Sequence, residues 1–287
     1  MSEGLRGHGI ARRRSSDPDQ HLWWRRFYLP VSYRARMSDP RLRKGARLVR
    51  DADDVVHHLG PELLAGAEAP ADELGEAIWG DPDGAFSADR FEDHPERVWN
   101  DWLGCWNDAG VDPDDVGPTP VHEHVAELVE DGFVSTVLTE NVFGQVRAAG
   151  VSATDSIKDH GRADRARCEH CDRTFDASSG RTTGHRRCHA CGGTLGPGVV
   201  LAGEPPARRD RLGAYARAEK CDAYVAAGTR LSVDPTAENA AHAVETEADL
   251  AVVSEEPTAM DGDADFRLRE DPNGAIARLR DAVAIRQ

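Results

Sequence analysis

Two short cysteine motifs constrain the fold of this chain more than any other feature of its sequence. Four of its six cysteines form the pairs Cys168/Cys171 and Cys188/Cys191, and sixteen residues separate the two pairs. Two such turns can direct four thiolates toward one Zn²⁺ ion in a tetrahedron, with no coordination position left open. Disulfides are the alternative, which the reducing interior of a cell disfavours. We therefore predict a structural zinc ion in a module that spans residues 164–195.

The overall composition is acidic and contains very little lysine. The 287 residues include 51 acidic and 35 basic side chains, a net charge of −16, and only Lys44, Lys158 and Lys220 are lysines. This composition is typical of proteins from high-salt surroundings, so we interpret the chain as halophilic-like. No run of about 18 apolar residues is present, and the N-terminus lacks the apolar core of a secretion signal. We expect a soluble, cytoplasmic protein with no membrane partner.

The charge is unevenly distributed along the chain. Residues 1–50 contain 13 basic and 4 acidic side chains, a net charge of +9, which leaves −25 on the remainder. This basic arm could bind a phosphate-bearing ligand or dock on the acidic part of the same chain. A zinc module with a basic arm would also suit a nucleic-acid-binding protein. The large negative charge of the remainder argues against nucleic acid as a partner.

Three short apolar runs alternate with predicted helices. The runs cover residues 133–138, 222–227 and 250–253, and each is followed by glycine or small polar residues. A helix capped by Thr119 is predicted before the first run, and another around 237–246. This pattern is typical of a parallel sheet covered on both faces, so we predict an α/β fold with a doubly wound, Rossmann-like sheet. Ligands of such a sheet bind at the carboxyl ends of its strands.

A segment with helical character precedes this pattern. Apolar and aromatic residues between Phe91 and Trp106 recur at helical spacing, which predicts a packed helix face. We predict a helical insertion over residues 31–110. Together with the zinc module, this insertion leaves residues 1–30, 111–163 and 196–287 for the domain that contains the sheet.

A series of motifs occurs in an order that a known family shares. Cys191–Glu204 reads C-G-G-T-L-G-P-G-V-V-L-A-G-E, and the further motifs are Thr139–Phe143, Ala149-Gly150, His160-Gly161, Gly228–Pro235, Ser254–Thr258 and Glu270–Leu279. This set resembles the sirtuin family of NAD-dependent protein deacylases. The family's motifs at these places include C-G-G-x-L-R-P-x-V-V-x-F-G-E, T-Q-N-I-D, H-G and G-T-S-L-x-V-x-P. The resemblance extends from about Phe86 to Leu279.

The resemblance implies an enzyme. It would transfer the acyl group from an acylated lysine of a protein substrate to ADP-ribose, with NAD as the cofactor and release of nicotinamide. His160 is then the base that accepts a proton from a ribose hydroxyl, a task that suits the ordinary pKa of histidine. Asn141 holds water and ribose near the reacting carbon. The resemblance therefore implies His160 and Asn141 as the catalytic residues, and a zinc ion that is structural.

The resemblance also implies the binding residues. Val199 and Val200 are expected to line the channel for the acyl-lysine and to pair with the substrate backbone as an added strand. Further substrate contacts are expected at Leu201, Gly203 and Glu204. The expected NAD contacts are Gly7, Gly9, Ile10, Glu140, Asn141, Phe143, Gly228, Thr229, Arg230, Ser254, Glu256 and Pro272.

Several positions depart from the family pattern. Phe143 stands where sirtuins have the aspartate that binds the nicotinamide amide, and Glu140 stands where they have glutamine. Phenylalanine, serine and asparagine of the family motifs are replaced by Ala202, Arg230 and Ser254. These changes favour an alternative, a catalytically weak sirtuin-like protein that binds NAD or ADP-ribose.

The N-terminal region departs further. Gly7-His8-Gly9-Ile10 resembles the start of the family's G-A-G-I-S loop, but Met1–Arg6 is too short and polar to form the buried strand that leads into it. We expect either that the true start lies upstream of Met1 or that the sheet lacks its first strand.

Overall fold

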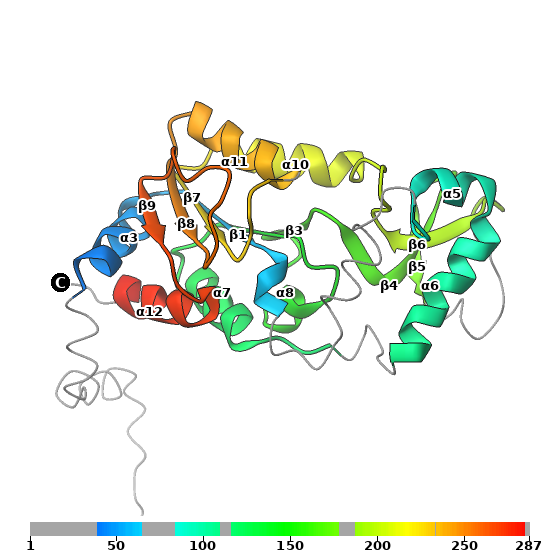
Figure 1. Ribbon diagram of the computed structural model, residues 1–287, viewed down its shortest axis with the longest axis horizontal. Coiled ribbons are helices and arrows are strands. Elements are labelled where there is room, and N and C mark those ends of the chain that lie inside the picture. Colours follow the sequence, from blue (N-terminus) through cyan, green and yellow to red (C-terminus); the bar gives the residue numbers. More distant parts are fainter. Residues whose placement is uncertain (1–38, 65–83, 110–115, 178–186, 233, 285–287) are drawn as a thin grey trace, which may run out of the picture. The chain divides into compact units, whose positions relative to one another are not determined.

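The computed structural model describes residues 39–64, 84–109, 116–177, 187–232 and 234–284 (Figure 1). The chain divides into two compact units, Met1–Asp39 and Pro40–Gln287, and the described elements lie in the second. The residues Gly7, Gly9 and Ile10, predicted to contact the cofactor, lie outside the described residues. Among the described helices, none has a stretch long and apolar enough to cross a membrane.

A six-stranded sheet forms the centre of the second unit. Its strands follow the order β3-β2-β1-β7-β8-β9, and every neighbouring pair is parallel. This order is that of a doubly wound sheet, with the reversal of strand order between β1 and β7. The predicted fold class is thereby confirmed. The strands are β1 (Val55–Leu59), β2 (Thr136–Thr139), β3 (Ser156–Lys158), β7 (Ala223–Ala227), β8 (Asp249–Val253) and β9 (Phe266–Leu268).

Helices cover both faces of this sheet (Figure 1). Helices α10 (Arg208–Ala218) and α11 (Thr236–Glu245) pack against each other on one face, where small alanine side chains allow close approach to the strands. The other face carries α3 (Pro40–Asp51), α7 (Pro120–Glu130) and α12 (Pro272–Ala284). Helix α7 begins after Thr119 as predicted and buries Val121, Val125 and Leu128.

The position of β1 corrects the sequence analysis. We predicted residues 31–110 as a helical insertion, yet Val55–Leu59 pairs with both β2 and β7 in the middle of the sheet. The apolar run is interrupted by His57 and His58, which are 1% and 0% exposed. Histidine is usually only partly buried, so two in succession concealed a central strand. The alternative in which the sheet lacks its first strand is therefore wrong.

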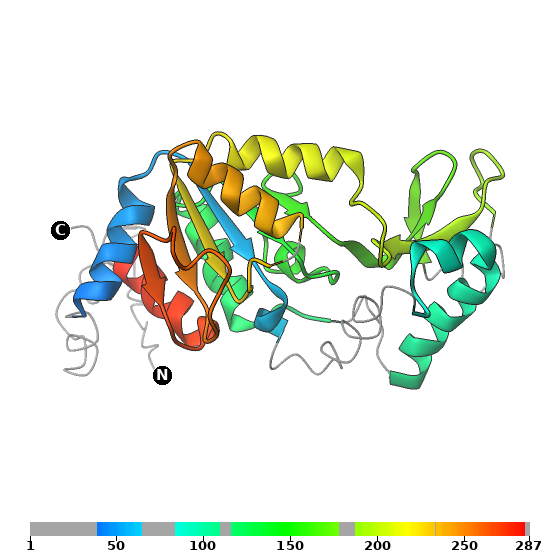
Figure 2. The same cartoon turned by 45° about the horizontal axis from the view of Figure 1, so that its top comes forward.

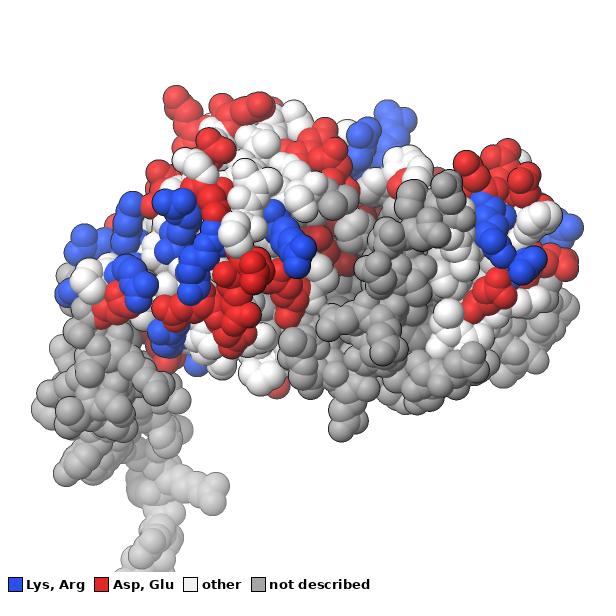
Figure 3. All heavy atoms as spheres, in the orientation of Figure 1, with Lys and Arg blue, Asp and Glu red and all other residues white. Residues whose placement is uncertain are grey.

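Helix α3 contains the last part of the predicted basic arm. Arg41 pairs with Glu270 at 3.5 Å, and Lys44 donates to the backbone oxygen of Asp265. On the face drawn in Figure 3, acidic and basic side chains lie close together over this part of the molecule. For α3, these contacts fit the alternative in which the basic segment docks on the acidic part of the same chain.

The remaining elements lie next to one another, away from the large sheet (Figure 2). Strands β4 (Gly161–Cys168), β5 (Thr174–Asp176) and β6 (Leu195–Val199) form an antiparallel sheet in the order β5-β4-β6. Helices α5 (Ala88–Asp93) and α6 (Pro95–Ala109) share an apolar cluster with it, which includes Phe91, Trp102 and Val199. Of the predicted helical insertion, these two helices form the part that packs outside the large sheet. The short elements η1 (Pro61–Leu64) and α8 (Gln145–Ala148) complete the described unit.

We predict that Gly60→Ala destabilises the protein. A methyl group on Gly60 would overlap the backbone carbonyl of Gly228, because the loops after β1 and β7 are joined by backbone hydrogen bonds. The overlap should lower the free energy of unfolding by about 1–3 kcal/mol, measured by urea denaturation. Gly104→Ala is the matched control, since nothing lies within 4 Å of its added methyl in α6. The control should gain about 0.5–1 kcal/mol, and equal losses in both variants would contradict this account.

Candidate active site

The carboxyl ends of the six parallel strands form the edge of the sheet where a ligand is expected. Gly60, Glu140, Asp159, Gly228 and Ser254 each follow directly after one of these strands. Helix α12 starts at this edge with the buried Pro272, where Asp271 accepts backbone hydrogen bonds from the first turn. The predicted cofactor contacts among the described residues follow strands of this sheet.

A row of buried polar side chains crosses four strands just below this edge. Tyr224 Oη and His58 Nδ1 are 2.5 Å apart, and His58 Nε2 lies 3.1 Å from the carboxylate of Asp159. Glu140 lies beside them, with one oxygen 3.9 Å from His58 Nε2 and the other 4.0 Å from His160 Nε2. The row therefore connects His160, the predicted base, to charged groups inside the sheet.

These contacts set the protonation of the row. Burial disfavours the charged form of His58, but the hydrogen bond and charge of Asp159 outweigh burial and raise the pKa of His58. Burial raises the pKa of Glu140, and His58 only partly opposes this shift. Burial lowers the pKa of His160 despite the nearby charge of Asp159, with His58 adding to the decrease. His160 is therefore neutral near pH 7, the form that can accept a proton.

The loop after β2 uses the predicted catalytic residue Asn141 for its own hydrogen bonds. Asn141 Oδ1 accepts from the backbone N–H of Phe143 at 2.8 Å, and its amide nitrogen donates to Gln145 Oε1. The side chain is buried, at 4% exposure for the residue. Lys158 Nζ donates to the backbone oxygens of Asn141 and Phe143 from below the loop. The part of Asn141 in holding water and ribose stays a prediction.

The ring of Phe143 lies in the apolar cluster beneath α5 and α6. It is 2% exposed and shares this cluster with Phe86, Trp102 and Leu201. The substitution of phenylalanine for the family's aspartate thus places an apolar side chain in a core. A contact between this ring and a cofactor stays a prediction.

The predicted residues after β7 and β8 lie at the same edge. Arg230 is 70% exposed at its side chain, and its Nε lies 4.0 Å from Glu62 in η1. Thr229 Oγ1 accepts from the N–H of Leu231 at 3.3 Å. Ser254 is fully buried, and its hydroxyl donates to the backbone oxygen of Glu256 at 3.0 Å. Arg230 therefore offers an exposed guanidinium donor at this edge, whereas the hydroxyl of Ser254 is used within the chain.

The predicted substrate segment Val199–Glu204 also forms hydrogen bonds within the chain. Val199 pairs with Gly161 of β4, and the N–H of Val200 donates to the carbonyl of His160 at 3.0 Å. These contacts lie on the side of the segment that faces β4, so the pairing of Val199 and Val200 with a substrate backbone stays a prediction. Glu204 accepts from the N–H of Leu201 at 3.1 Å and pairs with Arg167. Gly203 has a left-handed backbone, with φ of 80°.

The four predicted zinc ligands converge. Their Sγ atoms all lie within 4.8 Å of one another, with Cys168 and Cys191 at 3.5 Å and Cys171 and Cys188 at 3.7 Å. A tetrahedron of thiolates about 2.3 Å from Zn²⁺ requires sulfur separations of about 3.8 Å. Backbone N–H groups of His170, Ala190 and Gly193 donate to three of the sulfurs. The donor set fits a structural zinc ion.

Four residues of the site were missed by sequence reasoning. His58, Tyr224 and Asp159 form the buried row, and Glu62 lies opposite Arg230. The signal that could have found His58 was the order Val-Val-His-His-Leu-Gly, in which apolar residues and a terminal glycine enclose the histidines. No pattern in the sequence separates Asp159 or Glu62 from the many exposed carboxylates of this acidic chain.

The chain is similar to known proteins over most of its length. A family model described as the Sir2 family matches residues 74–235. The NAD-dependent protein deacetylase of Haloarcula marismortui is 32% identical over 236 residues, which cover 79% of this chain and 88% of that protein. The NAD-dependent protein deacylase 2 of Archaeoglobus fulgidus is 28% identical over 234 residues, 79% of this chain and 90% of that protein.

Solved structures agree with the fold. A structure described as the structural basis for the mechanism and regulation of Sir2 enzymes has a TM-score of 0.70 at 28% identity, covering 85% of this chain and 97% of its own. A Sir2 homologue in complex with NAD has a TM-score of 0.71 at 23% identity, covering 84% of this chain and 93% of its own. At that lower identity the likeness concerns the fold alone.

We predict that purified protein contains one zinc ion per chain and that Cys188→Ser loses it. Cys188 is a buried residue of the second cysteine turn. Its loss leaves three thiolates, too few to hold the metal that balances their charge. Metal content by mass spectrometry gives the result directly. Cys221→Ser is the matched control, because Cys221 is also buried but lies outside the cluster. Equal zinc content in both variants would contradict the assignment.

We predict that His57→Leu flattens the loss of stability in acid. His57 is buried and its ring nitrogens have no hydrogen-bond partner among the described residues, so burial lowers its pKa from 6.5 to about 3. A lowered folded-state pKa gives stability that is present above about pH 6.5 and lost as the pH falls. Between pH 7 and pH 5 this histidine should account for about 2 kcal/mol of the free energy of unfolding.

Urea denaturation at the two pH values measures the difference. His94→Gln, an exposed histidine after α5, should keep the wild-type pH dependence. If the free energy of unfolding of His57→Leu depends on pH as steeply as that of the wild type, His57 has the same pKa in the folded and the unfolded wild-type protein.

Proposed function

This chain belongs to the Sir2 family, and we propose that it is an NAD-dependent protein deacylase that moves an acyl group from a protein lysine to ADP-ribose and releases nicotinamide. The names of its relatives support this activity, and the structure described as Sir2Af2 bound to a myristoylated histone peptide, 27% identical, concerns an acylated peptide. The observation that carries the proposal is the neutral His160, which lies at the strand ends beside Glu140.

The residues at the strand ends suit a dinucleotide. Arg230 provides an exposed guanidinium group for phosphate, and Thr229 a hydroxyl group for ribose. The proposal also includes Gly228 and Ser254, whose backbone and hydroxyl groups are used within the chain. When bound, NAD supplies the ribose carbon that loses nicotinamide and takes up the acyl oxygen. The contacts of Glu256, Pro272, Asn141 and Phe143 with this cofactor belong to the same proposal.

His160 is the general base of the proposed reaction. Its neutral imidazole accepts a proton from a ribose hydroxyl, and its backbone carbonyl is held by the N–H of Val200. The acyl-lysine lies along Val199–Glu204, with the two valines contributing side-chain walls and the later residues the polar contacts. A zinc ion bound by the four cysteines would have no open coordination position. It would stabilise the sheet of β4, β5 and β6 without taking part in the chemistry.

Glu140 acts as a substitute for the glutamine of the family motif. Burial raises the pKa of Glu140 and so shifts the carboxyl group toward its uncharged form, which can both donate and accept a hydrogen bond. In that form Glu140 would not repel the diphosphate of NAD. The carboxylate of Asp159 lies 3.1 Å from the same His58 nitrogen that Glu140 approaches, and it balances the charge of that histidine.

A second candidate function is binding of NAD or ADP-ribose with little turnover. In doubly wound sheets the loop after the first strand binds the dinucleotide phosphates through its backbone N–H groups. Here the N–H groups of Gly60, Glu62 and Leu63 are all used within the chain, the first two on Ala227 and Gly228. These N–H groups are already used within the chain, and Phe143 lies in an apolar core. Both features favour a protein with weak catalysis.

Domain limits and location complete the proposal. We assign residues 111–163 and 196–287 to the NAD-binding domain and 164–195 to the zinc module, as predicted, and add the strand and helix within 40–64 to the former. The composition supports a cytoplasmic, halophilic-like protein, and its net charge of −16 argues against nucleic acid as a partner.

We predict that the protein releases nicotinamide from NAD when an acetylated peptide is present. His160→Ala should lower the rate about 100-fold or more, because the base is lost. Glu140→Gln should keep the rate within about threefold, because glutamine is the family's residue at this position and burial already favours the uncharged form of the carboxyl group. Chromatographic detection of nicotinamide gives the rates.

The outcomes separate the two candidates. Saturable NAD binding without peptide-dependent release, equal in wild type and His160→Ala, would reject the deacylase and support the binding protein. A large loss in Glu140→Gln would show that a charged Glu140 is required.

A further inference from the structure

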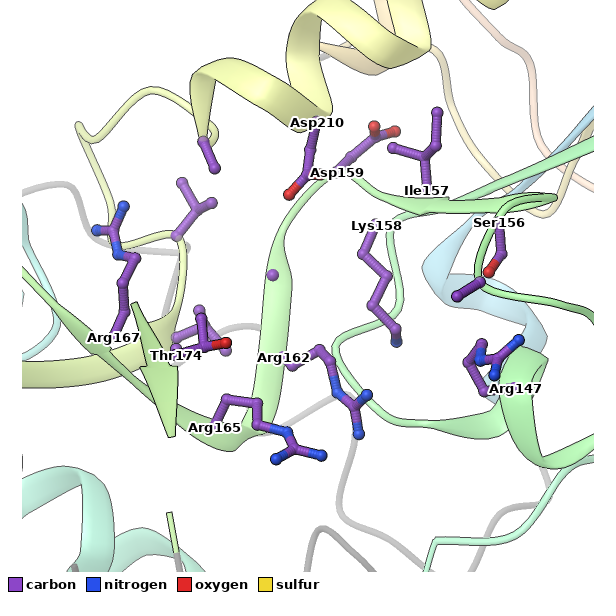
Figure 4. A pocket seen from close by; sticks show the side chains of 16 residues that line it. Arg147, Ser156, Ile157, Lys158, Asp159, Arg162, Arg165, Arg167, Thr174 and Asp210 are labelled. Carbon is purple, nitrogen blue, oxygen red and sulfur yellow. The ribbon is translucent and has the colours of Figure 1, made fainter. Parts of the chain in front are cut away.

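A second pocket lies along the free edge of the large sheet, where β3 has no further neighbour among the described strands. It has a volume of about 460 Å³ and is lined by residues of α8, β3, β4 and the first turns of α10, together with the end of β6 (Figure 4). Volumes of 300–1,000 Å³ are typical of small-molecule sites. The switch between β1 and β7, where NAD is proposed to bind, lies two strands away in the sheet.

Basic side chains gather at one end of this pocket. Arg147, Lys158, Arg162 and Arg165 come from α8, β3 and β4, and Figure 4 shows them on the same side of the pocket. In a chain with three lysines and a net charge of −16, such a group is unusual. Because several basic side chains of the described residues pair with carboxylates, the pairing of these four decides whether they can bind a ligand.

Among the described residues, few carboxylates pair with these four cations. Arg162 and Arg165 both pair with Asp164, with Arg162 Nε 2.7 Å from Oδ1 and Arg165 Nε 3.3 Å from Oδ2. Arg147 donates to the backbone oxygen of Val151, and Lys158 donates to the two backbone oxygens of the loop after β2. Neither forms an ion pair within the part of the chain that the structure describes. Within the described residues, Asp164 is therefore the one carboxylate that forms ion pairs with any of these four cations.

The surroundings of Lys158 lower the pKa of its ammonium group. Burial and the charge of Arg162 lower its pKa to about 7, and Asp164 opposes the shift only in part. His122 of α7 is also affected, since burial and the charge of Lys158 lower its pKa to about 4. An anion placed between these groups would favour the charged lysine.

The opposite end of the pocket is acidic. Asp159 and Asp210 lie there, near the start of α10 (Figure 4). Asp159 Oδ1 has no hydrogen-bond partner among the described residues, although its other oxygen faces His58. The pocket is therefore polarised, with acceptors at one end and an excess of cationic donors at the other.

We propose that this pocket binds a small phosphate-bearing molecule, with the phosphate among Arg147, Lys158, Arg162 and Arg165 and hydroxyl groups directed to Asp159 and Asp210. Guanidinium groups bind phosphate oxygens through paired hydrogen bonds, and a partly buried ammonium adds a point charge. The enclosed shape fits a small molecule and not an extended polyanion. The pocket shares Val199 and Val200 with the proposed acyl-lysine channel, but phosphate binding there does not require deacylase activity.

Calorimetric titration with inorganic pyrophosphate tests the site. The wild-type protein should bind one equivalent, with an affinity that falls as sodium chloride is added. Arg147→Gln and Arg165→Gln should each weaken binding about tenfold, because each removes a charge that faces the ligand. Arg97→Gln is the matched control, since Arg97 is 67% exposed at its side chain in α6 and lies outside the pocket. NAD affinity, measured in parallel, should be the same in all four proteins.

Proton uptake gives an independent readout. Near pH 7.5, pyrophosphate binding should draw roughly half to one proton onto Lys158, measured by titration in buffers of different ionisation enthalpy. Lys158→Gln should abolish this uptake. No saturable binding, binding unchanged in both arginine variants, or binding of the wild type without proton uptake would each overturn the proposal. Because NAD affinity and nicotinamide release are separate measurements, failure here leaves the deacylase proposal standing.

Discussion

The parallel pairing of β1 with both β2 and β7 is the constraint on which the candidate active site depends. Parallel strands bring their carboxyl ends to one edge, so residues from distant parts of the chain meet there without any direct sequence relation. Through β1, the loop that starts at Gly60 touches the loop that starts at Gly228. A slip of one residue in β1 would exchange His57 and His58 between the two faces of the sheet.

That register gives the two histidines opposite properties. His57 has no hydrogen-bonding partner among the described residues and is held neutral by burial, whereas His58 faces Asp159 and Tyr224 and favours its charged form. A buried charge is tolerated only where a partner is present, and Asp159 supplies that partner. Glu140 lies between His58 and His160. The protonation of His58 therefore affects the charge next to the proposed base.

The smaller sheet depends on a different interaction. Strands β4, β5 and β6 have few apolar residues of their own, and their core on the metal side consists of Cys168, Cys188 and Leu195 with Cys171 and Phe175 packed against it. A zinc ion would connect the two cysteine turns where apolar burial is insufficient. On its other side the same sheet is covered by α5 and α6 through the cluster that contains Phe143. Phe143 stands where the family has a polar residue, and its ring packs the loop after β2 against α5 and α6.

Local chemistry in the sequence was sufficient for several elements. The apolar runs predicted β2, β7 and β8, the capping threonine predicted α7, and the spacing of the cysteines predicted a cluster whose sulfurs do converge. These features depend on neighbours within a few residues, or on one type of ligand at a fixed spacing. Strand β1 was missed because His57 and His58 made a buried strand look polar, and β3 because it is a half-buried edge strand that contains Lys158.

Only the tertiary structure decided which polar groups face one another. The sequence contains Asp159, Glu140 and Lys158 among many charged residues. It does not say that the first supports His58, that burial raises the pKa of the second, or that the third lies among arginines with one shared carboxylate. The physical reason is that protonation depends on burial and on charges within a few ångströms. In this protein those neighbours come from strands separated by up to about a hundred residues along the chain, and they are brought together by the order of the sheet.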